Sequence, residues 1–226
     1  MITYHKDLEQ GSEAWLSARC GLLTASEMKN IITPAKLEPV KNPAHLYEML
    51  AQRITGYVEP QYISDDMLRG MTDEIDAKAL YAKHYAPVED MGFITNDEWG
   101  FKIGYSPDGL VGDDGLIEVK SRRQKYQTET IANGTLPDEY RIQVQTGLLV
   151  SQRKWCDFIS YCAGMPMFTL RVYPDANVQS CIVGAAYVFE EKLAALLEAY
   201  KFGIGNPAAR LIDTERKQPN EGDIVV

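Results

Sequence analysis

The sequence predicts an α/β fold in which a central mixed β-sheet is flanked by helices. Helical spacing comes first, three short strand-like segments follow it in the middle of the chain, and helix and strand then alternate. The turns between the strand-like segments are rich in Gly, Asn and Asp. With 226 residues, of which 45% are hydrophobic, the chain can bury one sizeable core. We expect a single domain over residues 1–226, with its core at about 10–200 and an irregular tail at about 203–226.

Helices are predicted where apolar residues recur at helical spacing and where a capping residue, such as Ser12 or Thr24, or a glycine marks an end. The expected helices cover residues 12–19, 24–32, 44–55, 65–85, 124–132, 137–151 and 178–200. Strands are predicted where β-branched and aromatic residues are bounded by turn residues. The expected strands cover residues 88–95, 101–106, 116–121, 155–163 and 169–173. Three prolines make 33–43 a predicted loop.

The four cysteines, at positions 20, 156, 162 and 181, are scattered, and no two are spaced as Cys-x-x-Cys. This spacing is typical of reduced thiols in a cytoplasmic protein, with a zinc or iron–sulfur site as the alternative. The N-terminus lacks the basic and then apolar layout of a signal peptide, and the longest apolar stretch, 181–189, is too short to cross a membrane. We expect a cytoplasmic protein that does not contact membranes.

The formal net charge of −9 by itself argues against a nucleic acid as the partner. For an enzyme this objection is weak, because catalytic carboxylates add negative charge until a metal binds them. A cleft can also be basic inside a protein whose exterior is acidic. The charge therefore does not exclude DNA.

The pattern that points to chemistry is Gly-Tyr-Ser-Pro-Asp-Gly at 104–109, followed by Glu-Val-Lys at 118–120. Asp108 follows a predicted strand at a turn. Glu118 and Lys120 alternate on the next strand, and residues two apart on a strand point to the same face. If the two strands pair as a hairpin, Asp108 lies beside Glu118. Two carboxylates and one ammonium group then share a small volume.

Two carboxylates this close repel each other unless a cation compensates them. The carboxylate oxygens of Asp108 and Glu118, with the backbone carbonyl of Val119, suit Mg²⁺, and Mn²⁺ as a substitute. Such a metal would polarise a phosphodiester and activate an attacking water. Lys120 would orient or deprotonate that water, or stabilise the transition state. The alternative is a surface hairpin with a solvated Glu–Lys pair, and we favour the metal-dependent nuclease site.

Three further features fit around this pattern. Glu74 lies on the predicted helix before the first of these strands, where the alternative is an exposed helix acid. Tyr140 and Gln143 are three residues apart on a predicted helix and share a face, although Gln143 could instead pair with backbone. Arg19 lies close to a predicted helix N-terminus that contains Ser26, and the two could bind a phosphate. The alternative for Arg19 is an ordinary salt bridge.

Together and in this order, these pieces resemble the phage lambda-type exonucleases, also called YqaJ-like viral recombinases, which belong to the wider PD-(D/E)xK nucleases. The resemblance spans about residues 10–165 and implies a restriction-endonuclease-like core. The residues that carry it are Trp15, Arg19, Gly21, Thr24, Ala25, Ser26, Gly70, Glu74, Ser106, Pro107, Asp108, Gly109, Glu118, Val119, Lys120, Tyr140, Gln143, Val144 and Gln145.

The resemblance implies an enzyme that digests one strand of linear double-stranded DNA from its 5′ end to mononucleotides and leaves 3′ single strands for recombination. It also implies a homotrimeric ring around DNA and a partner protein that anneals the exposed strand. The implied catalytic residues are Asp108, Glu118, Lys120 and Gln143, and the implied metal ligands are Asp108, Glu118, the Val119 carbonyl and Glu74. The implied contacts with DNA and its 5′ phosphate come from Arg19, Ser26, Ser106 and Tyr140. Roles for Arg122, Arg123 and the loop at 33–43 stay unassigned.

Two other functions remain open. A structure-selective or restriction-type endonuclease on the same fold would share the metal site and would need no pocket for a 5′ phosphate. A non-catalytic DNA-binding scaffold for recombination would not need the complete set of two acids and a lysine. The segment at 15–26 favours the exonuclease over the first alternative, and the complete set argues against the second.

Overall fold

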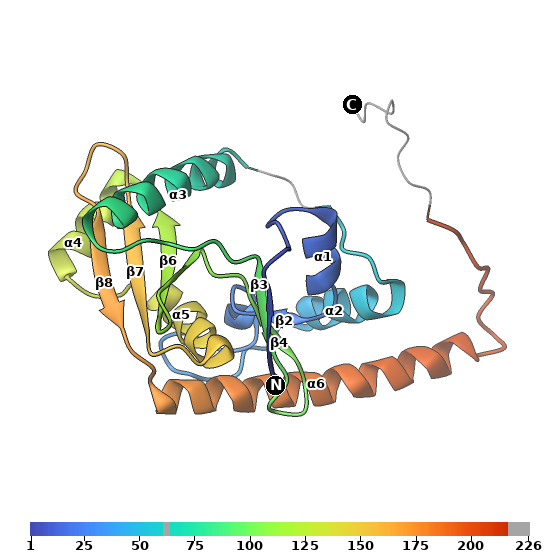
Figure 1. The fold of residues 1–226 in the computed structure, drawn as a ribbon. Helices are drawn as coiled ribbons and strands as arrows, with labels where there is room; N and C mark the ends of the chain where they lie inside the picture. The colour runs from blue at the N-terminus through green and yellow to red at the C-terminus, as the bar shows by residue number, and fades with distance from the viewer. Residues whose placement is uncertain (61–63, 217–226) are drawn as a thin grey trace, which may run out of the picture.

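The computed structural model describes residues 1–60 and 64–216, and within them it has six α-helices, one short 3₁₀ helix and eight strands (Figure 1). The strands form two mixed four-stranded sheets, and helices lie against both. This arrangement confirms the predicted α/β fold class, with two sheets in place of one continuous sheet.

The first sheet gathers strands from the N-terminal half of the chain. Its strands, in spatial order, are β1 (Ile2–His5), β3 (Phe93–Asn96), β4 (Ile103–Tyr105) and β2 (Leu23–Thr24). The pairs β1–β3 and β3–β4 are antiparallel, whereas β2 runs parallel to β4. Because β2 pairs with β4, the segment after α1 (Glu13–Arg19) lies next to the start of the turn that leads to Asp108.

The second sheet holds the Glu-Val-Lys pattern. Its strands, in spatial order, are β5 (Gly109–Val111), β6 (Gly115–Ser121), β7 (Trp155–Tyr161) and β8 (Phe168–Val172). β5 and β6 form the antiparallel hairpin that the sequence predicted, and β6 runs parallel to β7. β7 pairs with β6 along its whole length, as far as Ser121. β5 pairs only with the first three residues of β6, which are 115–117. From Glu118 onward, one edge of β6 therefore lacks a strand partner.

Two helices sandwich β6. α3 (Asp65–His84) contributes Ala77 and Tyr81 to a core cluster with Ile117 and Val119 of β6. α5 (Asp138–Ser151) lies between the two sheets and contacts β3, β4 and β7 (Figure 1). Because side chains alternate along a strand, the faces of β6 divide between these helices, and Glu118 points toward α5.

The remaining helices complete the fold. α4 (Gln124–Asn133) and α5 make the crossover between the parallel strands β6 and β7. α2 (Pro43–Thr55) ends at Gly56, whose φ of 63° is the left-handed conformation that glycine adopts most easily. The long α6 (Ala176–Ile204) packs on α2 and α5 and extends past the rest of the molecule (Figure 1). No helix in the described ranges is long and apolar enough to span a membrane.

The structure corrects several predicted elements. The helix expected over 24–32 is wrong: Thr24 belongs to β2, and only the 3₁₀ helix η1 (Met28–Asn30) follows. Pairing with β4 outweighs the capping preference of Thr24, since the Ala25 N–H donates to the carbonyl of Gly104 at 2.9 Å. The strand expected over 88–95 is limited to β3 and an isolated bridge at Glu89. Strands β1, β2 and β5 were not predicted, and residues 217–226 of the expected tail lie outside the described residues.

Candidate functional site

The candidate site lies at the open edge of β6. Asp108 stands just before β5, and its Oδ2 accepts the Val119 N–H at 2.5 Å. The N–H and C=O of one strand residue point toward the same edge, so the Val119 carbonyl faces the same side as Asp108. The hairpin therefore brings together the carboxylate and the backbone carbonyl that the sequence pattern pairs.

Glu118 is the most enclosed acid of the site, with only 1% of its surface exposed. Its Oε1 accepts hydrogen bonds from Lys120 Nζ at 2.7 Å and from Gln143 Nε2 at 2.5 Å. Its Oε2 accepts the Tyr105 hydroxyl at 2.9 Å. Three donors thus hold one carboxylate in a fixed orientation, and Gln143 pairs with a side chain and not with backbone.

Tyr105 was not among the predicted site residues. It is fully buried, and burial together with the negative charge of Glu118 raises the pKa of its hydroxyl well above the usual value. The Tyr105 ring fits against α5 because position 147 is glycine: a Cβ there would lie 2.7 Å from the ring. The only signal in the sequence was a tyrosine directly before Ser-Pro-Asp-Gly, and that signal does not indicate a carboxylate partner.

The charges of the site do not balance. Burial and the negative charge of Glu118 raise the pKa of the Asp108 carboxyl well above its ordinary value. Burial alone would lower the pKa of Lys120, but the charges of Glu118 and Asp108 outweigh it and raise that pKa. One ammonium group faces two carboxyl groups, and the raised pKa of Asp108 means that its protonated form is favoured when no cation is bound. A bound cation could take the place of that proton.

Glu74 approaches from α3. Its carboxyl is half-buried, and burial and the charge of Glu118 raise its pKa, although Lys78, 3.9 Å away, acts in the opposite direction. Among the described residues Glu74 makes no hydrogen bond to Asp108 or Glu118. It lies within electrostatic reach of them without contact.

The donors present fit a hard divalent cation. Asp108 Oδ1 accepts no hydrogen bond from the residues that the structure places, and carboxylate and carbonyl oxygens are the ligands such ions prefer. No three His, Cys, Asp or Glu side chains in the described ranges gather closely enough to hold a metal alone. A metal here would depend on Asp108, Glu118 and the Val119 carbonyl, with water completing its coordination and Glu74 behind it.

Arg19, at the end of α1, contacts the segment that precedes Asp108. Its guanidinium donates to Ser106 Oγ and to Thr24 Oγ1, both at 3.2 Å, and it stacks on the Trp15 ring at 4.2 Å from the centroid. Burial lowers the pKa of Arg19, partly offset by the charge of Glu27. No ion pair to Arg19 exists within residues 1–60 and 64–216, so the salt bridge considered from the sequence is wrong.

The other predicted phosphate contacts lie near Arg19. Ser106 also accepts the Trp15 indole N–H at 3.0 Å, and it precedes Asp108 by two residues in the sequence. Ser26 is exposed and touches Thr24, 3.3 Å away, but not Arg19. The α-helix expected to begin at Thr24 is absent, so the prediction that its N-terminus helps to bind a phosphate is wrong.

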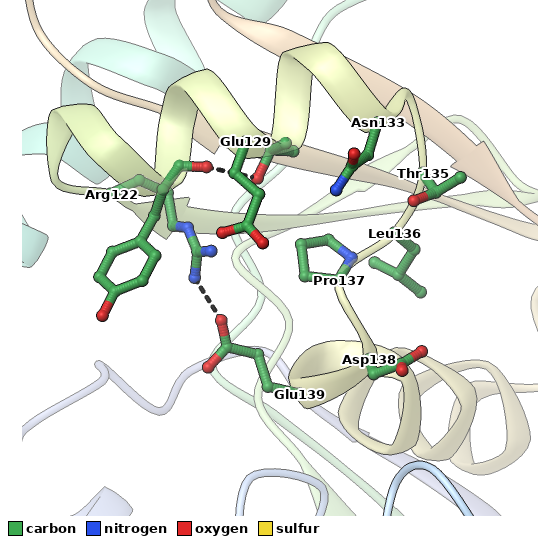
Figure 2. Close-up of a pocket in the computed structure, with 10 residues that line it drawn as sticks. Arg122, Glu129, Asn133, Thr135, Leu136, Pro137, Asp138 and Glu139 are labelled. Atoms are coloured by element: carbon green, nitrogen blue, oxygen red, sulfur yellow. Dashed lines mark hydrogen bonds and ion pairs between the residues drawn. The ribbon is translucent and has the colours of Figure 1, made fainter.

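Tyr140 and Gln143 come from one face of α5, as their spacing predicts. The Tyr140 ring lies 5.5 Å from Lys120 Nζ, and its hydroxyl accepts a hydrogen bond from Arg122 at 2.5 Å. A separate pocket of about 400 Å³ between α4 and α5 is lined by Arg122 (Figure 2). Glu139 already holds that arginine at 2.5 Å, and further acids line the pocket, which disfavours an anionic ligand there.

Comparison with known proteins places this chain in a family. Residues 14–154, more than half of the chain, match the YqaJ-like viral recombinase domain. The chain belongs to the YqaJ-like viral recombinase family. The matched residues include Arg19, Glu74, Asp108, Glu118 and Lys120, so the whole candidate site lies inside the YqaJ-like domain. No curated protein matches the chain significantly.

Solved structures agree with the family. An alkaline exonuclease (LHK-Exo) from Laribacter hongkongensis is 33% identical, with a TM-score of 0.76 over 86% of this YqaJ-like chain and 98% of the other. The same exonuclease in complex with dAMP matches over the same shares at 33% identity, with a TM-score of 0.77. A phage-related exonuclease from Haemophilus somnus 129PT, 16% identical over 78% of this chain and 96% of the other, has a TM-score of 0.53 and shares the fold.

Proposed function

We propose that this protein is a metal-dependent exonuclease that digests one strand of linear double-stranded DNA from the 5′ end to mononucleotides. The observation that carries the proposal is the cluster of Asp108, Glu118, the Val119 carbonyl and Lys120 at the open edge of β6. Family membership and the 33% identical exonuclease support the same activity. The direction, the duplex substrate and the metal are inferences from the resemblance and from the chemistry of the site.

Mg²⁺, or Mn²⁺ in its place, would polarise the phosphodiester and favour hydroxide over water as the nucleophile. Asp108, Glu118 and the Val119 carbonyl would hold it. Gln143 and Tyr105 keep the Glu118 carboxylate oriented, since each donates to one of its oxygens. Lys120 presents an ammonium group where negative charge develops during hydrolysis.

We infer that Arg19 and Ser106 receive the 5′ phosphate of the substrate, with Ser26 and Tyr140 at the edges of that site. Arg19 is partly buried, and in the part of the chain that the structure describes it contacts hydroxyl groups and two aromatic rings without an ion pair, so an anion would supply a counterion. Ser106 links this arginine to Asp108 two residues away. A strand end held at Arg19 would extend from there toward Asp108.

The resemblance also leads us to propose a biological setting. The product would be a duplex with a 3′ single-stranded overhang, which a single-strand annealing protein would use in phage-type recombination in the bacterial cytoplasm. A homotrimeric ring would enclose the DNA and keep the enzyme on its substrate.

One digestion assay tests the activity and its alternatives. The protein is incubated with Mg²⁺ and either linear or covalently closed duplex, and labels at the 5′ or the 3′ end report the direction and product size. We expect loss of linear DNA only, with mononucleotides released from the 5′ label first. Cutting of the closed circle would indicate an endonuclease instead, and no cutting of either DNA would indicate a binding scaffold.

A further inference from the structure

Two arginines beside the candidate site share one carboxylate. Arg69 NH1 donates to Asp66 Oδ1 at 2.7 Å, and Arg123 NH2 contacts both oxygens of Asp66 at 3.0 and 2.9 Å. About half of the Asp66 side chain is exposed, as are 40% of Arg69 and 62% of Arg123. The hydrogen bonds to the arginines lower the pKa of Asp66, so it is fully ionised at neutral pH.

This cluster is fixed to the same strand and helix as the candidate site. Arg69 Nε donates to Ser121 Oγ at 3.1 Å, and Ser121 directly follows Lys120 on β6. The Ser121 hydroxyl in turn donates to the buried Asp73 at 2.5 Å, which anchors the contact to α3. Glu74 follows Arg69 by five residues, about 7.5 Å along a helix.

The chemistry of the cluster suits a phosphodiester. A guanidinium group binds the two oxygens of a carboxylate and the two free oxygens of a phosphate with the same geometry. Arg69 also lies 3.8 Å from Asp73, so the two arginines face two carboxylates in the free protein. Displacement of Asp66 would leave one positive charge without a counterion, and a phosphodiester could neutralise it. Because all three side chains reach solvent, the carboxylate can be exchanged for an anion without opening the core.

We propose that Asp66 occupies the place of a DNA backbone phosphate in the free protein, and that the substrate strand displaces it from Arg69 and Arg123. This inference rests on the proposed function, because it says where the DNA strand that is cut at the candidate site contacts the protein next to that site. Asp66 then acts as an internal competitor for the two arginines. It weakens binding of DNA to an acidic protein until a strand engages both guanidinium groups.

The effect of one substitution on DNA affinity tests whether the DNA strand displaces Asp66 from the two arginines. Asp66→Asn keeps the size of the side chain and removes its charge, so the arginines become available. We expect it to tighten binding of a 5′-phosphorylated duplex by about threefold, whereas Arg69→Ala and Arg123→Ala each weaken binding by about tenfold. Fluorescence anisotropy in EDTA, over about 50–200 mM salt, measures affinity without cleavage. Each arginine variant should lower the slope of log affinity against log salt by roughly one.

Asp65→Asn is the matched control, because it removes the same charge from the same helical turn, and Asp65 pairs with no arginine among the described residues. It should change affinity less than Asp66→Asn does, and Asp66→Asn should have no effect beyond that of Asp65→Asn once both arginines are alanine. If the two aspartate variants have equal effects, or if Asp66→Asn binds DNA more weakly than the parent, Asp66 does not compete with DNA for the arginines. Digestion by the parent would then still support the proposed function. A parent that neither binds nor digests duplex would overturn the proposed function and this inference together.

Discussion

Two buried carboxylates on neighbouring strands of one sheet have different surroundings. Asp157 on β7, 4% exposed, receives Arg171 Nε and NH2 at 2.8 Å each and the Tyr81 hydroxyl at 2.6 Å. One negative charge meets one positive charge there, and a hydroxyl group fills the remaining position. The charge of Asp157 is therefore neutralised, and both of its oxygens accept hydrogen bonds.

Glu118 on β6 is equally well hydrogen-bonded, but it does not stand alone. Asp108 lies beside it, and among the described residues Asp108 receives only the Val119 N–H. The ammonium group of Lys120 cannot neutralise both acids. The two strands therefore differ not in the burial of their carboxylates but in the presence of a second acid that lacks a counterion, which is the feature expected of a cation-binding site.

The arginines repeat this contrast. Arg171 is bidentate on Asp157, and Arg53 is bidentate on Glu190 at 2.7 Å for both contacts. Arg19 is partly buried, and within residues 1–60 and 64–216 its hydrogen bonds go to hydroxyl groups and not to an acid. Arg19 is joined through Ser106 to the turn that carries Asp108, which is the connection that neighbouring sites for a metal and for a terminal phosphate would require.

The largest effect is expected from Lys120→Ala. Removing a cation that acts where charge develops should lower turnover on linear duplex by about 10³-fold, while affinity for DNA and the fold change little. Initial digestion rates and anisotropy measure the two quantities. Lys154→Ala is the control, since Lys154 is an exposed lysine paired with Asp114 at 2.9 Å. Activity within a few-fold of the parent would remove Lys120 from the catalytic site.

Metal affinity gives the next effect. Asp108→Asn and Glu118→Gln each remove one formal charge from a site for a hard ion, so we expect each to weaken Mn²⁺ binding by about tenfold or more. Calorimetric titration of the purified variants measures it. Asp157→Asn, in the same sheet, should leave the affinity unchanged. If both site variants bind Mn²⁺ as the parent does, the metal lies elsewhere.

Arg19, which makes no ion pair within the described residues, and Arg171, which pairs with Asp157, should differ in their effect on the digestion of DNA ends. Arg19→Ala should slow digestion of 5′-phosphorylated ends by about tenfold, because a charge-assisted hydrogen bond contributes about 1.5–3 kcal/mol. It should also shrink the preference for a phosphate over a 5′ hydroxyl. Arg171→Ala should lower stability and leave the preference intact. Equal parent rates on both end types would exclude the 5′-phosphate site and leave the metal site untouched.

The sequence supports much of the site because its contacts are local or periodic. Asp108, Glu118 and Lys120 follow from a hairpin and from strand alternation, and Gln143 follows from helical spacing relative to Tyr140. The hydrogen bond from Gln143 to Glu118 then needs only that α5 faces β6.

The features that the sequence does not reveal depend on pairings between distant segments. β5 has three residues and reads as part of a turn. Thr24 has the side chain of an N-cap, but its backbone pairs with β4. The donation from Tyr105 to Glu118 and the cluster at Asp66 both require the position of one element on another, which no local pattern encodes.

The smallest effects, on stability, should have opposite signs at the two carboxylates. Asp157→Asn leaves Arg171 without its counterion and should destabilise the protein by about 1–3 kcal/mol. Asp108→Asn removes repulsion between acids and keeps an acceptor for the Val119 N–H. In EDTA it should raise the melting temperature by roughly 2–4 °C, the shift that about 1 kcal/mol produces in a chain of this size. Thermal unfolding followed by circular dichroism measures both.

The pH dependence of stability tests whether Asp108→Asn stabilises the protein by removing repulsion between the two acids. The pKa of this carboxyl is raised in the folded state, so the stability it contributes is complete below its ordinary pKa of 3.8 and is lost as pH rises through the raised value. The advantage of Asp108→Asn over the parent should therefore be absent in acid, grow toward neutral pH in EDTA, and vanish or reverse when Mg²⁺ supplies the missing charge. Asp157→Asn should stay less stable than the parent at neutral pH with or without Mg²⁺. If Asp108→Asn is less stable than the parent at neutral pH in EDTA, the two acids do not repel each other. The charge of Asp108 would then be neutralised in the free protein, as that of Asp157 is.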